Sequence, residues 1–274
     1  FERGVAEITA LRGRPVCVLA SGDPFLYGVG AVLARDIAAD EMDVLPAPSS
    51  FSLAAARLGW PLQEVTTLSV HGRPLELLRP HLHPNRRLLV LTPDATGPAA
   101  MAAYLASLGF SDAKLTVLEA LGGPNERIRS ARADDFDLTD IAALNLVAIE
   151  TGVASGLVIP FTPGLPDSAF DHDGQITKSE IRALTLAALA PRHGEHLWDI
   201  GAGSGSVAIE WMLADASLAA TAIEADPVRA SRIAANAQAL GVPGLAVVTG
   251  AAPAALEGLA PPDAVFIGGG GSAP

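Results

Sequence analysis

The sequence is poor in cysteine, lysine and aromatic residues. Of its 274 residues one is cysteine, Cys17, two are lysine, and 5% are aromatic. A single cysteine excludes an internal disulfide framework. No apolar run reaches the ~18 residues that a membrane span needs, and no signal-peptide pattern opens the chain. These absences predict a cytoplasmic protein with no membrane partner.

Basic residues are also few. Eighteen Lys and Arg stand against 30 Asp and Glu, which leaves a net charge of −12. Binding to nucleic acid needs clustered cations that neutralise phosphates, so we expect no nucleic-acid partner. Nearly all the basic residues are Arg, which binds carboxylates in a bidentate fork. A polycarboxylate ligand would need a locally positive cleft, and we expect Arg73, Arg127 or Arg182 to line it.

The strongest motif lies at residues 197–211, where an apolar strand leads into a glycine-rich turn and then a helix. Gly201, Gly203 and Gly205 allow the backbone to turn sharply and to approach a ligand closely. A second apolar strand ends in Glu224, the position from which a carboxylate can accept hydrogen bonds from ribose hydroxyls. The pattern therefore predicts a nucleotide-type cofactor site.

The glycine spacing distinguishes between cofactors. A dinucleotide fingerprint is G-x-G-x-x-G, but this run is G-x-G-x-G and lacks the third glycine. Asp199, directly before the run, suits a cationic cofactor without phosphates. These features favour S-adenosylmethionine (SAM) over NAD. An NAD-dependent oxidoreductase stays open as an alternative, and so does a binding module without activity.

The order of elements predicts two α/β domains. Strands are expected at residues 14–20, 42–45, 65–70, 87–92, 114–118 and 144–149, with helices at 28–39, 49–58 and 97–108 between them. Pro, Gly, Asp and Ser then dominate a linker at 158–175. The alternation of helices and strands after it is typical of the first half of a doubly wound, Rossmann-like sheet. We expect domains at 1–157 and 176–274, each continuing beyond this sequence at its outer end.

A second candidate site follows the first predicted strand. Gly22, Asp23 and Pro24 form a tight turn at a strand end, the usual ligand position in open α/β sheets. Together with the Pro- and Ser-rich loop at 46–50 and the loop that begins at His71, this turn resembles the tetrapyrrole methylase family, the class III SAM methyltransferases. The segment from residue 176 resembles class I SAM methyltransferases.

The combination resembles the fused precorrin methyltransferases of cobalamin biosynthesis. The resemblance implies SAM-dependent methylation of a precorrin at two meso carbons, C5 and C15, with decarboxylation of an acetate side chain. We expect a tetrapyrrole substrate and a homo-oligomer. A SAM-dependent methyltransferase acting on another small molecule is the alternative.

The candidate site residues follow from these patterns. Gly201, Gly203 and Gly205 are assigned to close backbone approach, Glu224 to the ribose and Asp199 to the region of the methionine amine. By resemblance, Thr177 is assigned to the methionine end of the cofactor, and Gly22, Asp23 and Pro24 to a second SAM site. Methyl transfer requires no serine or cysteine nucleophile, and no metal is expected. The candidates for acid–base chemistry are His71, Glu180, Glu210 and His172.

Overall fold

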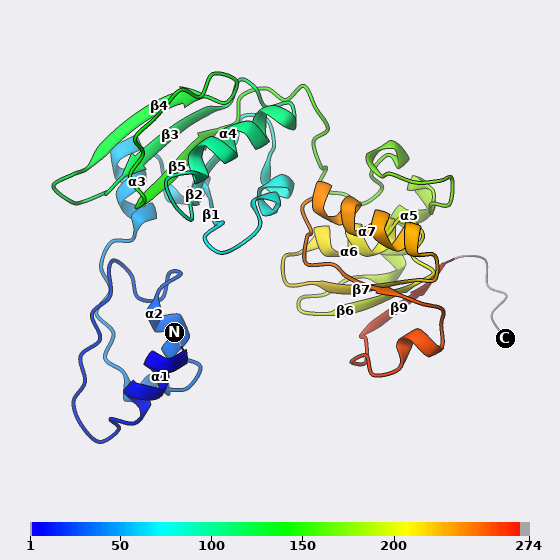
Figure 1. Ribbon diagram of the computed structural model, residues 1–274, viewed down its shortest axis with the longest axis horizontal. Helices are drawn as coiled ribbons and strands as arrows, with labels where there is room; N and C mark the ends of the chain where they lie inside the picture. Colours follow the sequence, from blue (N-terminus) through cyan, green and yellow to red (C-terminus); the bar gives the residue numbers. More distant parts are fainter. Residues whose placement is uncertain (1, 269–274) are drawn as a thin grey trace. The chain divides into compact units, whose positions relative to one another are not determined.

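The computed structural model describes residues 2–268, so the last six residues of the predicted second domain lie outside it. The chain divides into two compact units (Figure 1). Residues up to Gly72, with Asn85–Val153, form the first unit, and Arg73–Pro84, with the residues from Ala154 onward, form the second. In the part of the chain that the structure describes, no helix is both long and apolar enough to cross a membrane.

The first unit is built on a five-stranded mixed sheet in the order β1-β2-β5-β3-β4. β1 and β2 are parallel, and the other neighbours are antiparallel. The strands are β1 (Thr66–Ser69), β2 (Arg87–Leu91), β3 (Lys114–Glu119), β4 (Arg127–Arg132) and β5 (Asn145–Glu150). The α-helices are α1 (Glu2–Thr9), α2 (Val29–Leu33), α3 (Ser50–Leu58) and α4 (Gly97–Ser107), with short 3₁₀ turns at Ala39–Glu41 and Leu62–Glu64.

Helix α3 covers one face of this sheet. The Ser49 side chain caps it by accepting a hydrogen bond from the Ser52 amide. Phe51 packs with Leu89, Leu118 and Leu146, which point to the same face of their strands. The intervening residues of β2 and β5 are buried as well, so both faces of the sheet are covered. Helix α4 lies across the sheet in Figure 1.

The N-terminal part of the first unit differs from the prediction. The expected strands at 14–20 and 42–45 are not formed, and neither segment pairs with the five-stranded sheet. A β-strand needs a neighbouring strand to bond its backbone amides and carbonyls, and these two segments have none in the sheet. Their apolar side chains are not all buried either, since Leu19 and Leu45 are exposed. The helix expected at 28–39 is limited to α2.

The second unit has a four-stranded, fully parallel sheet in the order β8-β7-β6-β9. The strands are β6 (His196–Ile200), β7 (Ala219–Glu224), β8 (Ala246–Thr249) and β9 (Ala264–Ile267). The helices are α5 (Ser179–Leu189), α6 (Ser206–Ala214) and α7 (Pro227–Ala239), with 3₁₀ turns at Leu75–His81, Asp167–Ala169 and Ala254–Leu256. The strand, glycine-rich turn and helix predicted within residues 197–211 are formed as β6, residues 201–205 and α6, and the strand predicted to end at Glu224 is β7. Both units are α/β structures, as expected.

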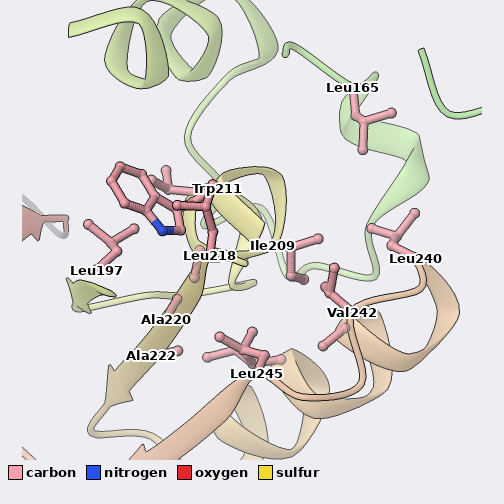
Figure 2. Close-up of a cluster of buried hydrophobic side chains, with 14 of the residues drawn as sticks. Leu165, Leu197, Ile209, Trp211, Leu218, Ala220, Ala222, Leu240, Val242 and Leu245 are labelled. Carbon is pink, nitrogen blue, oxygen red and sulfur yellow. The ribbon is translucent and has the colours of Figure 1, made fainter. Parts of the chain in front are cut away.

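The core of the second unit is centred on Trp211, Leu197 and Ile209 (Figure 2). The Trp211 indole N–H donates to the Ala219 carbonyl oxygen, which satisfies its polar edge inside the core. Residues from the predicted linker at 158–175 also belong to this core. Ile159, Leu165 and Phe170 are at most 5% exposed.

Candidate functional site

The carboxyl ends of four parallel strands meet at one edge of the second sheet. The loop of residues 201–205 follows β6, and Glu224 ends the neighbouring β7. The Gly250 amide donates to the Glu224 carbonyl oxygen, and the Gly268 amide donates to that of Ile200. This edge is where open α/β sheets bind ligands, so the structure brings the predicted glycines and Glu224 together.

The three glycines of the loop adopt conformations that other residues rarely take. Gly201, Gly203 and Gly205 have φ angles of 71°, 60° and 76°. A Cβ on Gly203 would lie 3.1 Å from the Gln175 carbonyl oxygen, and one on Gly205 would lie 2.6 Å from Cγ2 of Ile233. The loop therefore needs glycine both for its backbone angles and for its close packing.

Glu224 is buried behind the glycine loop. One carboxylate oxygen accepts a 2.8 Å hydrogen bond from the Gly203 amide, and the other accepts from the Asp226 amide at 3.0 Å. The carboxylate thus fixes the loop, and each oxygen has a further lone pair.

Asp199 is 1% exposed at the end of β6. Its Oδ2 accepts a 3.1 Å hydrogen bond from the Ala208 amide in the first turn of α6. Within residues 2–268, its Oδ1 and the buried Ser204 hydroxyl have no hydrogen-bond partner. Burial raises the pKa of Asp199 to about 7; the Ala208 hydrogen bond opposes this shift, whereas the neighbouring Glu224 charge adds to it. An acceptor oxygen is therefore available beside the glycine loop.

Thr177 belongs to a segment that passes over the glycine loop, residues 171–177, here called the strap. Thr177 is partly buried, and its carbonyl oxygen accepts a hydrogen bond from the Arg182 guanidinium. The Gln175 carbonyl oxygen stands against Gly203. The strap thus places Thr177 on the same side of the second unit as the predicted cofactor residues.

Glu210 and Arg182 form a buried ion pair with a nitrogen–oxygen distance of 2.6 Å. Glu210 also accepts hydrogen bonds from the Gly164 and Leu165 amides, and Arg182 is 0% exposed. The prediction that Arg182 lines an open cleft is therefore wrong: the neighbouring Ile181 faces solvent, whereas the arginine turns inward to Glu210. Glu210 fastens the chain before α5 to α6.

The remaining acid–base candidates are more accessible. Glu180 is exposed in the first turn of α5 and accepts a hydrogen bond from the Ser179 hydroxyl. His172, in the strap, accepts a hydrogen bond from the Gly174 amide through Nδ1. His71 is exposed in the first unit, with Nδ1 3.4 Å from the Thr92 carbonyl oxygen.

The turn at Gly22, Asp23 and Pro24 packs against the loop at 46–50, but the strand that was expected to lead into it is not formed. Gly22 has a φ of 70°, and a Cβ there would lie 3.3 Å from the Pro48 carbonyl oxygen. Asp23 accepts a hydrogen bond from the Phe25 amide, and the Pro24 carbonyl oxygen accepts one from the Gly30 amide. The turn is thus tightly built.

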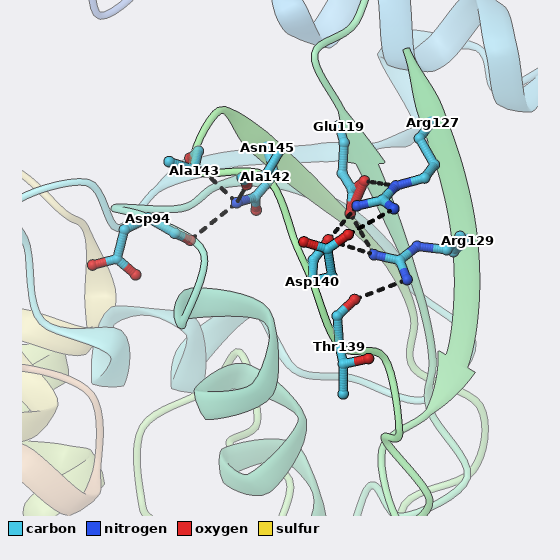
Figure 3. Close-up of polar contacts among 9 residues, drawn as sticks. All are labelled: Asp94, Glu119, Arg127, Arg129, Thr139, Asp140, Ala142, Ala143 and Asn145. Carbon is cyan, nitrogen blue, oxygen red and sulfur yellow. Dashed lines mark hydrogen bonds and ion pairs between the residues drawn. The ribbon is translucent and has the colours of Figure 1, made fainter. Parts of the chain in front are cut away.

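Sequence reasoning missed a polar cluster at one edge of the first sheet (Figure 3). Glu119, 1% exposed, receives hydrogen bonds from Arg127 and Arg129 on the paired strand β4. Burial opposes ionisation, but the two guanidinium groups outweigh it and lower the Glu119 pKa. The Asn145 amide group donates to carbonyl oxygens of Asp94, Ala142 and Ala143. The alternation of charged and apolar side chains at Arg127, Ile128 and Arg129 was the available sequence signal for β4.

Arg127 is committed to this cluster, because it also contacts Asp140. These two ion pairs explain the position of Arg127 without a substrate, so its place in a substrate cleft stays a prediction. Arg73, the third predicted arginine, is exposed.

Two family models cover most of the chain. Residues 3–137 match the tetrapyrrole (corrin/porphyrin) methylases, and residues 168–274 match the precorrin methyltransferase domain. A precorrin-6Y C(5,15)-methyltransferase (decarboxylating) from Sinorhizobium sp is 61% identical over 99% of this chain and 66% of that protein. The chain belongs to the precorrin methyltransferases.

Other precorrin methyltransferases are similar over comparable lengths. The Mycobacterium tuberculosis protein of the same name is 43% identical over 96% of this chain and 65% of its own length. The chain thus spans just under two thirds of these relatives. A crystal structure is known for the C-terminal domain of precorrin-6Y C5,15-methyltransferase from Rhodobacter capsulatus, and its sequence is 58% identical to the matched part of this chain. The match covers 42% of this chain and 61% of that one, with a TM-score of 0.40.

Proposed function

We propose that the chain acts in SAM-dependent methylation of a precorrin at C5 and C15, with decarboxylation of an acetate side chain, in cobalamin biosynthesis. The observation that carries this proposal is the glycine loop between Glu224 and the unpartnered Asp199 oxygen, within a chain that is 61% identical to a relative of that name.

The residues present fit a SAM molecule. A Cβ at Gly203 would crowd the Gln175 carbonyl oxygen at 3.1 Å, Asp199 offers an oxygen to the methionine ammonium group, and Glu224 retains lone pairs for the ribose hydroxyls. Thr177 is assigned to the methionine end. When bound, SAM supplies a methyl group on a positively charged sulfur. The protein then holds donor and acceptor carbon in line, and such positioning supplies about 7–11 kcal/mol of a reaction barrier.

Decarboxylation breaks the bond between a side-chain carbon and its carboxylate. The electron pair passes into the conjugated macrocycle, and a proton must return to carbon. Glu180 is the exposed carboxyl nearest in sequence to Thr177 and is assigned to hold or deliver this proton. Glu210 is engaged with Arg182 and two amides, and we assign it a positioning role instead.

In the first unit we assign Gly22, Asp23 and Pro24 to a second SAM site and His71 to the substrate side. We infer that the two units divide the two methylations, and that the second also decarboxylates. This division is supported by the separate matches of the two parts of the chain to methylase families.

Calorimetric titration with S-adenosylhomocysteine tests the proposal. Wild-type chain is expected to bind it and not NAD, and Gly203→Val is expected to lose binding at the second unit. A second equivalent, retained in Gly203→Val, would come from the first unit. Binding of NAD in place of S-adenosylhomocysteine would refute the assignment and favour an oxidoreductase. Sedimentation measured on the same samples tests the predicted homo-oligomer.

A further inference from the structure

Asn236, on α7, joins the strap to the glycine loop. It is 4% exposed. Its Oδ1 accepts a 2.9 Å hydrogen bond from the Asp171 amide, while its Nδ2 donates to the carbonyl oxygens of Asp171 and Ser204, both at 2.9 Å. One side-chain amide thus satisfies both backbone groups of Asp171 and one carbonyl of the glycine loop. Only a side chain with an acceptor and a two-proton donor can do this.

Ion pairs hold the strap to the same helix. Asp173 accepts a 2.8 Å hydrogen bond from Nε of Arg229 and lies 3.3 Å from Nη1 of Arg232. The Arg229 hydrogen bond is the main reason that the pKa of Asp173 is well below its usual range. The other Asp173 oxygen accepts a hydrogen bond from the Gln175 amide, which orients the part of the strap over Gly203.

Both ends of the strap are therefore fixed. Asn236 holds the beginning, at Asp171, and Arg182 holds the end, through the Thr177 carbonyl oxygen. Between them the Gln175 carbonyl oxygen lies so close to the loop that a Cβ on residue 203 would be 3.1 Å from it. The strap is thus a built wall of the candidate cofactor site.

We propose that Asn236 is a positioning residue, which locks the strap over the glycine loop so that Thr177 meets the amino-acid end of the cofactor. This inference rests on the proposed function. Asn236 does not itself contact the ligand. It acts by setting the distance between two backbone segments that do, and Asp173 assists it from the exposed side.

The test compares Asn236→Asp with Asn125→Asp, which makes the same amide-to-acid change at an exposed loop position of the first unit. In Asn236→Asp a carboxylate oxygen replaces the Nδ2 donor. It would repel the carbonyl oxygens of Asp171 and Ser204 instead of bonding to them. Asp173→Ala is the second variant, because it removes the ion pairs to α7 and the Gln175 contact but keeps the Asn236 and Arg182 contacts at the two ends of the strap. Each protein is titrated with S-adenosylhomocysteine and with 5′-methylthioadenosine, which lacks the amino-acid end. Hydrogen exchange of residues 171–177 is measured without ligand.

We expect Asn236→Asp to bind S-adenosylhomocysteine about tenfold more weakly and Asp173→Ala about threefold more weakly. Affinity for 5′-methylthioadenosine should fall less in Asn236→Asp and stay unchanged in Asp173→Ala. Exchange in the strap should accelerate in both strap variants, and Asn125→Asp should resemble wild type.

Equal losses for both ligands, or unchanged exchange in the strap, would overturn the inference, because they indicate a general structural effect. Wild-type affinity in both strap variants would overturn it as well while leaving the proposed function intact. If wild-type protein bound neither ligand, the proposed function would fail and the inference with it.

Discussion

Replacing Asp199 with asparagine removes a buried carboxyl group beside the glycine loop and keeps the shape of the side chain. Asparagine can still accept the hydrogen bond from the Ala208 amide. In the wild-type protein, burial together with the nearby Glu224 charge raises the pKa of Asp199 to about 7. An unfolded aspartate titrates near pH 4.

The sign of the effect follows from this shift. The neutral form of Asp199 contributes stability that is fully present below about pH 4 and is lost as the pH rises through about 7. A shift of about three pKa units corresponds to roughly 4 kcal/mol. The free energy of unfolding of Asp199→Asn minus that of the wild type should therefore be about 2 kcal/mol larger at about pH 8.5 than at about pH 5.5.

Urea unfolding at these two pH values measures the difference. In a Trp60→Phe background the fluorescence comes from Trp198 and Trp211, which both lie in the second unit. The variant should be more stable than wild type, most clearly at the higher pH, yet bind S-adenosylhomocysteine more weakly, because asparagine lacks the charge that would meet the ammonium group. A stability difference that is the same at both pH values would refute the reasoning.

Three further changes have defined outcomes. Gly205→Ala places a methyl group 2.6 Å from Ile233 Cγ2, so thermal unfolding should show a loss of about 1–3 kcal/mol; an unchanged melting temperature would contradict this packing. Glu210→Gln removes the 2.6 Å partner of the buried Arg182 charge and leaves only Asp167, at 3.4 Å, so urea unfolding should show a loss of about 3 kcal/mol. The lowered pKa of Glu119 contributes stability above about pH 4 that is lost as the pH falls through the folded pKa. Acid unfolding followed by circular dichroism should therefore start nearer neutral pH in Glu119→Gln.

The second unit could be predicted well because its signals are local. A short apolar strand, glycines at alternate positions and the Pro at the start of α7 each specify backbone conformation within a few residues. The strand, turn and helix expected within residues 197–211 are formed in that order. The grouping of the glycines with Glu224 then follows from the parallel order of the strands.

Other features depend on contacts that sequence patterns do not reveal. The segment at 14–20 has the composition of a strand, but a strand requires a neighbour, and composition cannot supply one. Arg182 occupies a helix position next to exposed apolar residues, so its burial against Glu210 contradicts simple amphipathic patterning. The sequence around Asn236 is that of an ordinary helix. Its role depends on contact with the strap, which lies more than sixty residues earlier in the chain.

The composition of residues 158–175 predicted a linker between the domains, but Ile159, Leu165 and Phe170 are core residues of the second unit. The Gly164 and Leu165 amides are also donors to Glu210. A protein cut at residue 176 would lose three buried side chains and leave that carboxylate short of two hydrogen bonds. A fragment that is meant to keep this core intact must therefore include Ile159. Because residues 73–84 also belong to the second unit, no single cut of the chain separates the two units cleanly.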